Sequence, residues 1–424
     1  HNSAYNLYLD GELVTDLTIP DGVTSVNTVF ANCSSITSVT IPSGVTEIAD
    51  GAFADCQNLS EITLPDSLKT IGERAFSRTA LTEITLPDSI IEVGKYAFEY
   101  VSTLERATLS SGLTEISDSL FSGCESLTSV TIHNGVTSIG SYAFSGTGLK
   151  GIAIPDTVTS IGDSVFGGDY YGAKRCPIET ATIPAIACSS VKNKLKTVVI
   201  TSGESIEDNA LSYCGSLTSV TVHNSVSSIG SRVFYNCGLT SITIPDSVTR
   251  IGSQAFEGCL IETATIPAIA CSSVRNGKLK TVVITSGESI GSGAFWGCSS
   301  LTSVTIGNSV TSIESSAFYN CSSLTSVTIG NSVTSIGSSA FYNCSSLTLS
   351  LIHISDFWCS INFADFGSNP LYFAHNLYIN GQHTVELKIL GITSISNYAF
   401  SDCRSLTSIT IGDNVASIGK DAFL

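Results

Sequence analysis

Hydrophobic residues return along this chain in the same order every 22 or 23 residues. Residues 301–323 read LTSVTIGNSVTSIESSAFYNCSS, and residues 324–346 repeat them with one difference, Glu314 against Gly337. Related segments begin at Ile36, Leu59, Leu81, Leu104, Leu127, Leu149, Leu195, Leu217, Leu239, Leu279 and Leu406. A fixed period in this range is typical of a solenoid, in which each repeat forms one coil against its neighbours.

Within one repeat, the pattern predicts two short extended segments and a tight turn. Val304 and Ile306 alternate with Thr305, which is the period of a β-strand. A Gly or a Pro-Asp pair then turns the chain, a second apolar pair returns along the other side, and Ser-Ser-Ala-Phe forms one helical or 3₁₀ turn. We therefore expect these side chains of the coil to point inward: Leu301, Val304, Ile306, Val310, Ile313, Ala317, Phe318 and Cys321.

The fourteen cysteines follow the repeat and include no CxxC pair, so the zinc-ribbon and thioredoxin patterns are absent. A position that recurs in each coil stacks into an internal column, where a thiol acts as a small hydrophobe. Disulfides between adjacent coils are the alternative, although stacked side chains point the same way and disfavour the required dihedral angle. Ten cysteines stand three residues after the repeat's Phe, or after Leu211: Cys33, Cys56, Cys124, Cys214, Cys237, Cys259, Cys298, Cys321, Cys344 and Cys403.

Interruptions of the repeat divide the chain. Two near-identical segments keep one strand and its Ile-Pro and then lose the second half of the coil. Asp10-Gly11 and Asn380-Gly381 each follow an LYL or LYI segment and favour type I′ hairpins. The last repeat stops in mid-coil at Leu424, so we expect the natural chain to continue or this coil to fray. The predicted divisions are an N-terminal cap hairpin at 1–13, a repeat array at 14–346 with short coils at 178–194 and 261–278, an aromatic-rich irregular break at 347–376, and a hairpin that opens a second array at 377–424.

The repeat LxxVxIPxxVxxIGxxAFxxCxx resembles that of the BspA-like leucine-rich repeat proteins, from about Val14 to Leu424. The resemblance implies a right-handed leucine-rich-repeat superhelix with a parallel β-sheet on the concave face and short strands or 3₁₀ and helical turns on the convex side. It also implies a bacterial or protozoan protein that is secreted or held at the cell surface and adheres to host matrix proteins or other cells. The family's repeats carry no catalytic residues, so we expect no enzyme activity and no cofactor.

Composition limits the possible partners. The formal net charge is −17 and only 13% of residues are charged, so the chain lacks the basic patch that nucleic-acid binding requires. No apolar run reaches the length of a membrane span, and no secretory signal is present, although the start at HNSAYNLYLDG looks trimmed. We expect a monomer that meets protein or glycan ligands on host or neighbouring cells.

Hydroxyl side chains line the outward positions of the predicted strands. One interpretation is that Thr suits strands and provides solubility without charge; ice binding, which also uses threonine rows, is disfavoured because Ser is mixed among them. The other interpretation is a broad, weakly charged surface for protein or glycan, which would depend on multivalency. The candidate contact residues are Thr131, Thr221, Thr302, Thr305, Thr325 and Thr328.

A loop at 167–176 adds Tyr170, Tyr171 and Arg175, which could contact a partner or belong to a tolerated insertion. No metal site is expected. The Asp residues that follow Pro are typical turn formers rather than calcium ligands, and the histidines near the aromatic break match no ligand spacing. Three functions stay open: an adhesion or binding protein, a spacer that displays another domain, and the repeat region of a larger secreted enzyme.

Overall fold

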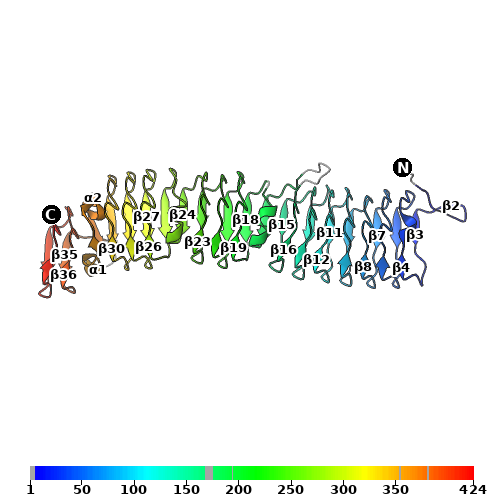
Figure 1. Cartoon of the computed structure of the whole chain (residues 1–424), viewed down its shortest axis with the longest axis horizontal. Coiled ribbons are helices and arrows are strands. Elements are labelled where there is room, and N and C mark those ends of the chain that lie inside the picture. Colours follow the sequence, from blue (N-terminus) through cyan, green and yellow to red (C-terminus); the bar gives the residue numbers. More distant parts are fainter. Residues whose placement is uncertain (1–4, 168–174, 193, 353–354, 380–381) are drawn as a thin grey trace. The chain divides into compact units, whose positions relative to one another are not determined.

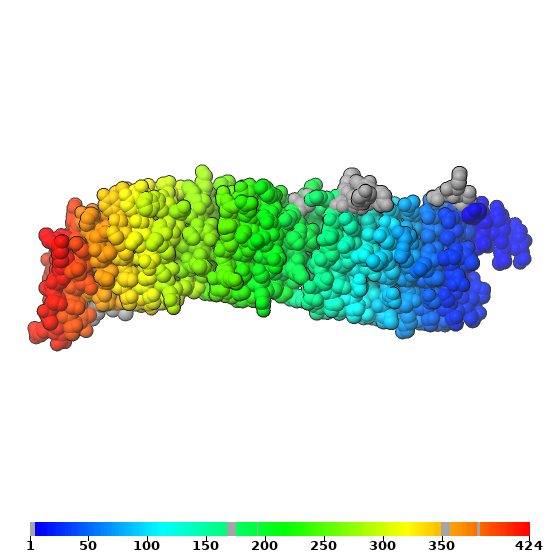
Figure 2. Space-filling view, viewed as in Figure 1, coloured from blue at the N-terminus to red at the C-terminus, as the bar shows by residue number. Residues whose placement is uncertain are grey.

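The computed structural model describes residues 5–167, 175–192, 194–352, 355–379 and 382–424 (Figure 1). The chain divides into two compact units, residues 1–203 and 204–424. Within each unit the chain is a parallel β-solenoid, in which one coil follows another. The space-filling view shows the same order, because successive sequence colours follow one another as bands within each unit (Figure 2).

In the first unit, every coil contributes a longer strand and most add a two-residue strand. Within each sheet the register is kept from coil to coil: Asp16 pairs with Ser38, and Ser38 pairs with Glu61. The longer strands are β3 (Asp16–Thr18), β5 (Ser38–Thr40), β7 (Glu61–Thr63), β9 (Glu83–Thr85), β11 (Arg106–Thr108), β13 (Ser129–Thr131), β15 (Gly151–Ala153), β17 (Thr180–Ile183) and β18 (Thr197–Ile200). The two-residue strands are β4 (Ser25–Val26), β6 (Glu47–Ile48), β8 (Thr70–Ile71), β10 (Glu92–Val93), β12 (Glu115–Ile116), β14 (Ser138–Ile139) and β16 (Ser160–Ile161).

The second unit repeats this arrangement, and its largest sheet has eight strands in the order β22-β24-β25-β27-β29-β31-β33-β34. The longer strands are β20 (Ser219–Val222), β22 (Ser241–Thr243), β24 (Thr263–Ile266), β25 (Thr281–Ile284), β27 (Ser303–Ile306), β29 (Ser326–Ile329), β31 (Leu349–Ile352), β33 (Leu377–Ile379), β35 (Glu386–Ile389) and β37 (Ser408–Ile411). The two-residue strands are β19 (Ser205–Ile206), β21 (Ser228–Ile229), β23 (Arg250–Ile251), β26 (Ser289–Ile290), β28 (Ser312–Ile313), β30 (Ser335–Ile336), β32 (Asn362–Phe363), β36 (Ser394–Ile395) and β38 (Ser417–Ile418).

The core of each unit consists of columns of identical side chains. All eight residues predicted to point inward in the coil 301–323 are buried, which confirms the assignment of one coil to each repeat. The phenylalanines form a stacked ladder: from Phe30 to Phe166 successive ring centroids lie 5.4–5.9 Å apart. One coil alone buries too few of these groups to offset its conformational entropy, so each coil depends on its neighbours for stability.

The cysteine column lies beside the phenylalanines. All fourteen cysteines fall in the described residues, and all are free thiols; thirteen are buried and Cys403 is partly exposed. The Cys56 thiol donates to the carbonyl of Phe30 in the preceding coil at 2.9 Å, and Cys344 donates to Phe318 at 3.3 Å. The burial predicted for this position is confirmed, and the thiol also satisfies a backbone acceptor inside the core.

Each short coil replaces its two-residue strand with a 3₁₀ helix, η2 (Ala185–Ser190) in the first unit and η3 (Ala268–Ala270) in the second. An aspartate in the coil before each short coil accepts hydrogen bonds from the coil after it. The Asp246 carboxylate accepts hydrogen bonds from the hydroxyls of Thr285 at 2.5 Å and Ser286 at 2.6 Å. Asp156 accepts equivalent bonds from Thr201 and Ser202 in the first unit.

The remaining elements lie near the two hairpins. Strands β1 (Tyr8–Leu9) and β2 (Glu12–Leu13) pair antiparallel around Asp10 and Gly11, which both have positive φ. Strand β33 pairs antiparallel with β34 (Gln382–His383), whereas Asn380-Gly381 lies outside the described residues. The other elements are η1 (Thr28–Phe30), α1 (Ser355–Cys359), η4 (Phe366–Ser368) and α2 (Leu371–Ala374).

Candidate binding surfaces

The predicted threonines lie on the face formed by the longer strands, and the structure separates them into two rows. Thr302 and Thr325 are exposed, but their hydroxyls donate to the carbonyls of Lys280 and Thr302 at 2.9 and 3.0 Å. These hydroxyls therefore help to join adjacent coils. Thr305 pairs with Thr328 inside the sheet, and both are half-buried. Thr131 and Thr221 lie on β13 and β20 and are exposed.

The predicted loop contact is only partly described. Tyr170 and Tyr171 lie outside the described residues. Arg175 is exposed and lines a cavity of about 630 Å³ beside the first short coil, together with Phe166 and Ile186. The cavity borders η2, where the short coil lacks the second half of a regular coil.

The second short coil borders a shallower and more open depression, lined by Asp208, Arg250 and Ile269. Ile269 is equivalent to Ile186, and these two isoleucines are 52% and 43% exposed. Exposed isoleucines at equivalent places result from the duplicated sequence, and each provides an apolar contact next to charged groups.

Arginines stack on tyrosines of the next coil in the first unit. The guanidinium of Arg74 lies 4.2 Å from the ring centre of Tyr96, and that of Arg78 lies 5.4 Å from Tyr100. All four residues have positive φ, between 54° and 61°. The Tyr100 ring lies so close to the next coil that a Cβ at Gly123 would be 2.3 Å from it. We call these four residues the Arg-Tyr cluster.

Aromatic side chains form a row in the second unit, in which Trp296 is exposed and the two tyrosines are half-buried. Trp296, Tyr319 and Tyr342 come from three successive full coils, with ring centroids 4.4 Å and then 5.4 Å apart. We call these three residues the aromatic row. Phe366 and Phe373 contact Tyr342 edge-on at its far end. Sequence reasoning missed this row, although aligning the repeats at the position after Phe would have revealed it.

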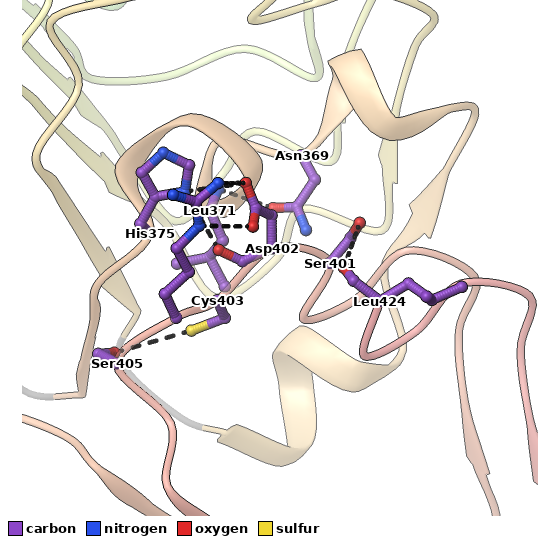
Figure 3. A network of polar contacts seen from close by, with 9 residues as sticks. Asn369, Leu371, His375, Ser401, Asp402, Cys403, Ser405 and Leu424 are labelled. Atoms are coloured by element: carbon purple, nitrogen blue, oxygen red, sulfur yellow. Dashed lines mark hydrogen bonds and ion pairs between the residues drawn. The ribbon is translucent and has the colours of Figure 1, made fainter.

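One cluster near the C-terminal coils combines His, Asp and Cys (Figure 3). His375 Nδ1 lies 3.1 Å from a carboxylate oxygen of Asp402, and Arg404 donates to the same carboxylate at 2.8 and 3.1 Å. The Cys403 sulfur lies 3.9 Å from the Ser405 hydroxyl, and burial raises the pKa of its thiol. A neutral thiol that faces a serine instead of the histidine is not an activated nucleophile, so the network holds α2 against the following coil.

No other chemistry-bearing constellation appears in the described parts of the chain. Among those residues, no group of three His, Cys, Asp or Glu side chains is placed to hold a metal ion. The helices found there are also too short or too polar to cross a membrane.

Stacked coils of 22 or 23 residues, with buried Leu, Phe and Cys columns, define a leucine-rich-repeat solenoid. The chain belongs to the BspA-type leucine-rich repeat family. The profile of this family, described as a BspA type Leucine rich repeat region with six copies, matches residues 6–78, 23–134, 47–173, 204–277, 268–362 and 372–424. Leucine-rich-repeat solenoids of this family are generally not catalytic.

Several solved structures resemble the chain. A leucine rich cell surface protein from Faecalibacterium prausnitzii is 28% identical, with 82% of this chain and 90% of that chain covered and a TM-score of 0.38. A leucine-rich repeat protein from Eubacterium ventriosum is 26% identical over 58% and 83%, with a TM-score of 0.30. The pneumococcal vaccine antigen PcpA is 18% identical over 76% and 85%, with a TM-score of 0.32. No curated protein matches the chain's sequence.

Proposed function

We propose that this protein is a secreted or cell-surface adhesion protein, which uses its coils to present contact residues to proteins or glycans on host or neighbouring cells. Family membership supports a surface repeat protein, and one similar structure carries the name of a cell surface protein.

The observation that carries this proposal is the Arg-Tyr cluster. Positive φ costs a side chain with a Cβ roughly 1 kcal/mol, and Gly, Asn and Asp tolerate it best. Two residues after the core Phe, other coils place Asn32, Asp55, Asn320 and Asn343; two residues before it, they place Ser119, Ser316 and Ser339. Single Arg or Tyr residues also occur there, as Tyr142, Arg232, Tyr398 and Tyr213, but the Arg-Tyr cluster has them at both positions of two successive coils. Arg and Tyr are the residues that contribute most to protein interfaces, so a gain in binding would explain their retention at a conformational cost.

An exchange for asparagine separates binding from folding. We expect the double variant Arg78→Asn, Tyr100→Asn to be at least as stable as the original chain, because each site gains up to roughly 1 kcal/mol in backbone conformation. We expect its binding to cells and immobilised matrix proteins to weaken by about tenfold or more. Arg106→Asn, on the long-strand face of the next coil, is the matched control and should bind normally.

The measurement is saturable binding of the purified chain to whole cells, matrix proteins and glycans, alongside thermal unfolding of each variant. Unchanged binding by the Asn variant, with binding lost in Thr305→Glu, Thr328→Glu, would place the contact on the long-strand face. Binding to none of these targets would contradict the proposal and favour a spacer that displays another domain.

A further inference from the structure

The coil has no structural need for an aromatic ring directly after its core phenylalanine. In the second unit this position holds the aromatic row, Trp296, Tyr319 and Tyr342, in three successive full coils, and Tyr235, Glu257 and Ser401 in other coils. In the first unit the equivalent residues are small or polar: Ala31, Ala54, Ser77, Glu99, Ser122, Ser145 and Gly167. These coils stack their phenylalanines equally well, so the rings of the aromatic row are an addition to the surface.

The backbone holds the aromatic row in a fixed register. The Gly297 amide donates to the Tyr319 carbonyl at 2.8 Å, and the Asn320 amide donates to the Tyr342 carbonyl at 2.9 Å. Beneath the row, Phe295, Phe318 and Phe341 stack with centroids 5.3 and 5.2 Å apart. A surface that is ordered before binding loses little entropy when a ligand arrives.

Trp296 begins the row and has one open face. Tyr319 stacks on one side of its indole, at an interplanar angle of 25°. On the other side lies the short coil 261–278, which lacks the Ala-Phe turn, and within the described residues no ring or cation stacks there. Arg275 of that coil instead donates to the Gly293 carbonyl at 3.2 Å. The face of the Trp296 indole away from Tyr319 therefore has no stacked ring or cation among the described residues, and the residue is 50% exposed.

The coils that carry the row hold almost no charge, although Arg275 contacts the Trp296 coil at one end and Asp365 contacts the Tyr342 coil at the other. Between residues 289 and 355 the only Asp, Glu, Lys or Arg is Glu314, and its carboxylate accepts hydrogen bonds from Ser289 and Ser312. Next to the rings lie amides, and the Asn343 side chain donates to that of Asn320 at 2.9 Å. Apolar rings bordered by neutral donors and acceptors match an uncharged ligand that carries hydroxyl groups.

We propose that the aromatic row binds an uncharged polysaccharide, with a sugar ring against the open face of Trp296 and hydroxyls on the amides beside the tyrosines. The apolar C–H face of a pyranose fits the open face of the indole, whereas Tyr319 and Tyr342 stack on their neighbours and offer their ring edges to the rest of the ligand. An extended peptide fits less well, because Gly297 and Asn320 already use their backbone amides between coils. This inference rests on the proposed binding function and names one ligand class for it.

The test uses the whole chain with soluble mixed-linkage β-glucan and galactomannan in affinity electrophoresis and calorimetry. Trp296→Ser and Tyr319→Ser introduce a residue that other coils carry at this position, so folding should be preserved. Tyr142→Ser is the matched control, because it removes a tyrosine from the first unit where neighbouring coils have Ser119 and Ser164. We expect binding of at least one neutral polysaccharide, with affinity reduced at least about tenfold by Trp296→Ser and unchanged by Tyr142→Ser.

Tryptophan fluorescence gives an independent measurement, because the only other tryptophan, Trp358, is fully buried. Bound sugar should protect Trp296 from acrylamide quenching, with little effect of added salt. The proposal would be overturned if no neutral polysaccharide bound, or if Trp296→Ser bound it as well as the original chain. It would also be overturned if the row bound only a charged polysaccharide (polygalacturonate), only an unfolded protein (reduced and alkylated lactalbumin), or only a second copy of this chain. Cell binding that persists in any of these cases would leave the proposed adhesion function intact.

Discussion

The buried cysteine shows how one side chain meets two demands at the same position. Cys56 fills a small space in the column and also donates to a carbonyl of the preceding coil. Thr79 occupies this position in the following coil and donates to Phe76 of its own coil at 2.9 Å. Burial raises the pKa of Cys56 and of Cys344 to about 12, so these thiols stay protonated and unreactive at neutral pH.

At high pH, the raised pKa of the Cys56 thiol should make the stability of the original chain differ from that of Cys56→Ala. The folded thiol keeps its proton above pH 9, where the unfolded thiol ionises, so its contribution to stability is complete below the unfolded pKa and is lost as pH rises to about 12. Each such thiol lowers the unfolding free energy by roughly 1.4 kcal/mol per pH unit in this window. We expect Cys56→Ala to be less stable at pH 7 and to have a shallower decline above pH 9, as measured by denaturant unfolding. Parallel curves for the two proteins would contradict this.

The residues of the core could be predicted from the sequence, because equivalents of Leu301, Phe318 and Cys321 recur at fixed positions in most coils. The aromatic row could not, because the position after Phe varies among Ala, Ser, Glu and Tyr and has no role in packing. Stacking alone places Trp296 on Tyr319, and a single repeat contains no sign of that contact.

At the scale of the coil, the Ile that ends the two-residue strand is followed in most coils by a Gly, as in Ile336-Gly337. Successive coils approach each other closely at this Gly. A Cβ at Gly337 would lie 2.5 Å from the backbone nitrogen of Ser315. A Cβ at Gly291, which follows a short coil, would meet nothing within 4 Å. The same sequence pair is therefore under different constraints in different coils.

Gly337→Ala and Gly291→Ala test this difference directly. We expect Gly337→Ala to destabilise the fold by about 1–3 kcal/mol, because the coils must shift to admit the methyl group. Gly291→Ala should change stability by less than about 0.5 kcal/mol. Chemical denaturation of both variants would measure this, and equal losses would show that close approach is not the reason for the glycine.

The coils and their order could likewise be predicted, whereas the bridges over the short coils could not. Asp246 looks like an ordinary turn former after Pro245 in the sequence. Its partners Thr285 and Ser286 come near only because the 3₁₀ helix η3 leaves room between two full coils.

At the scale of the whole molecule, stability in each unit comes from contacts between neighbouring coils. Removing residues 301–323 joins Ser300 to Leu324 and keeps the repeat in phase. We expect this deletion variant to fold with a modestly lower melting temperature, because one interface between coils is lost. Removing only 301–311 would put strand residues where a turn belongs, and circular dichroism should then show loss of cooperative unfolding. Similar behaviour of the two variants would contradict a coil-by-coil stack.

The near-identity of residues 301–323 and 324–346 has a further consequence at the level of the gene. Recombination between two such stretches of DNA adds or removes a whole coil and leaves the reading frame and the hydrophobic columns intact. Each added copy would also bring one more tyrosine in line with Tyr319 and Tyr342. Populations could therefore change the reach of this surface by altering repeat number, with no new point mutation.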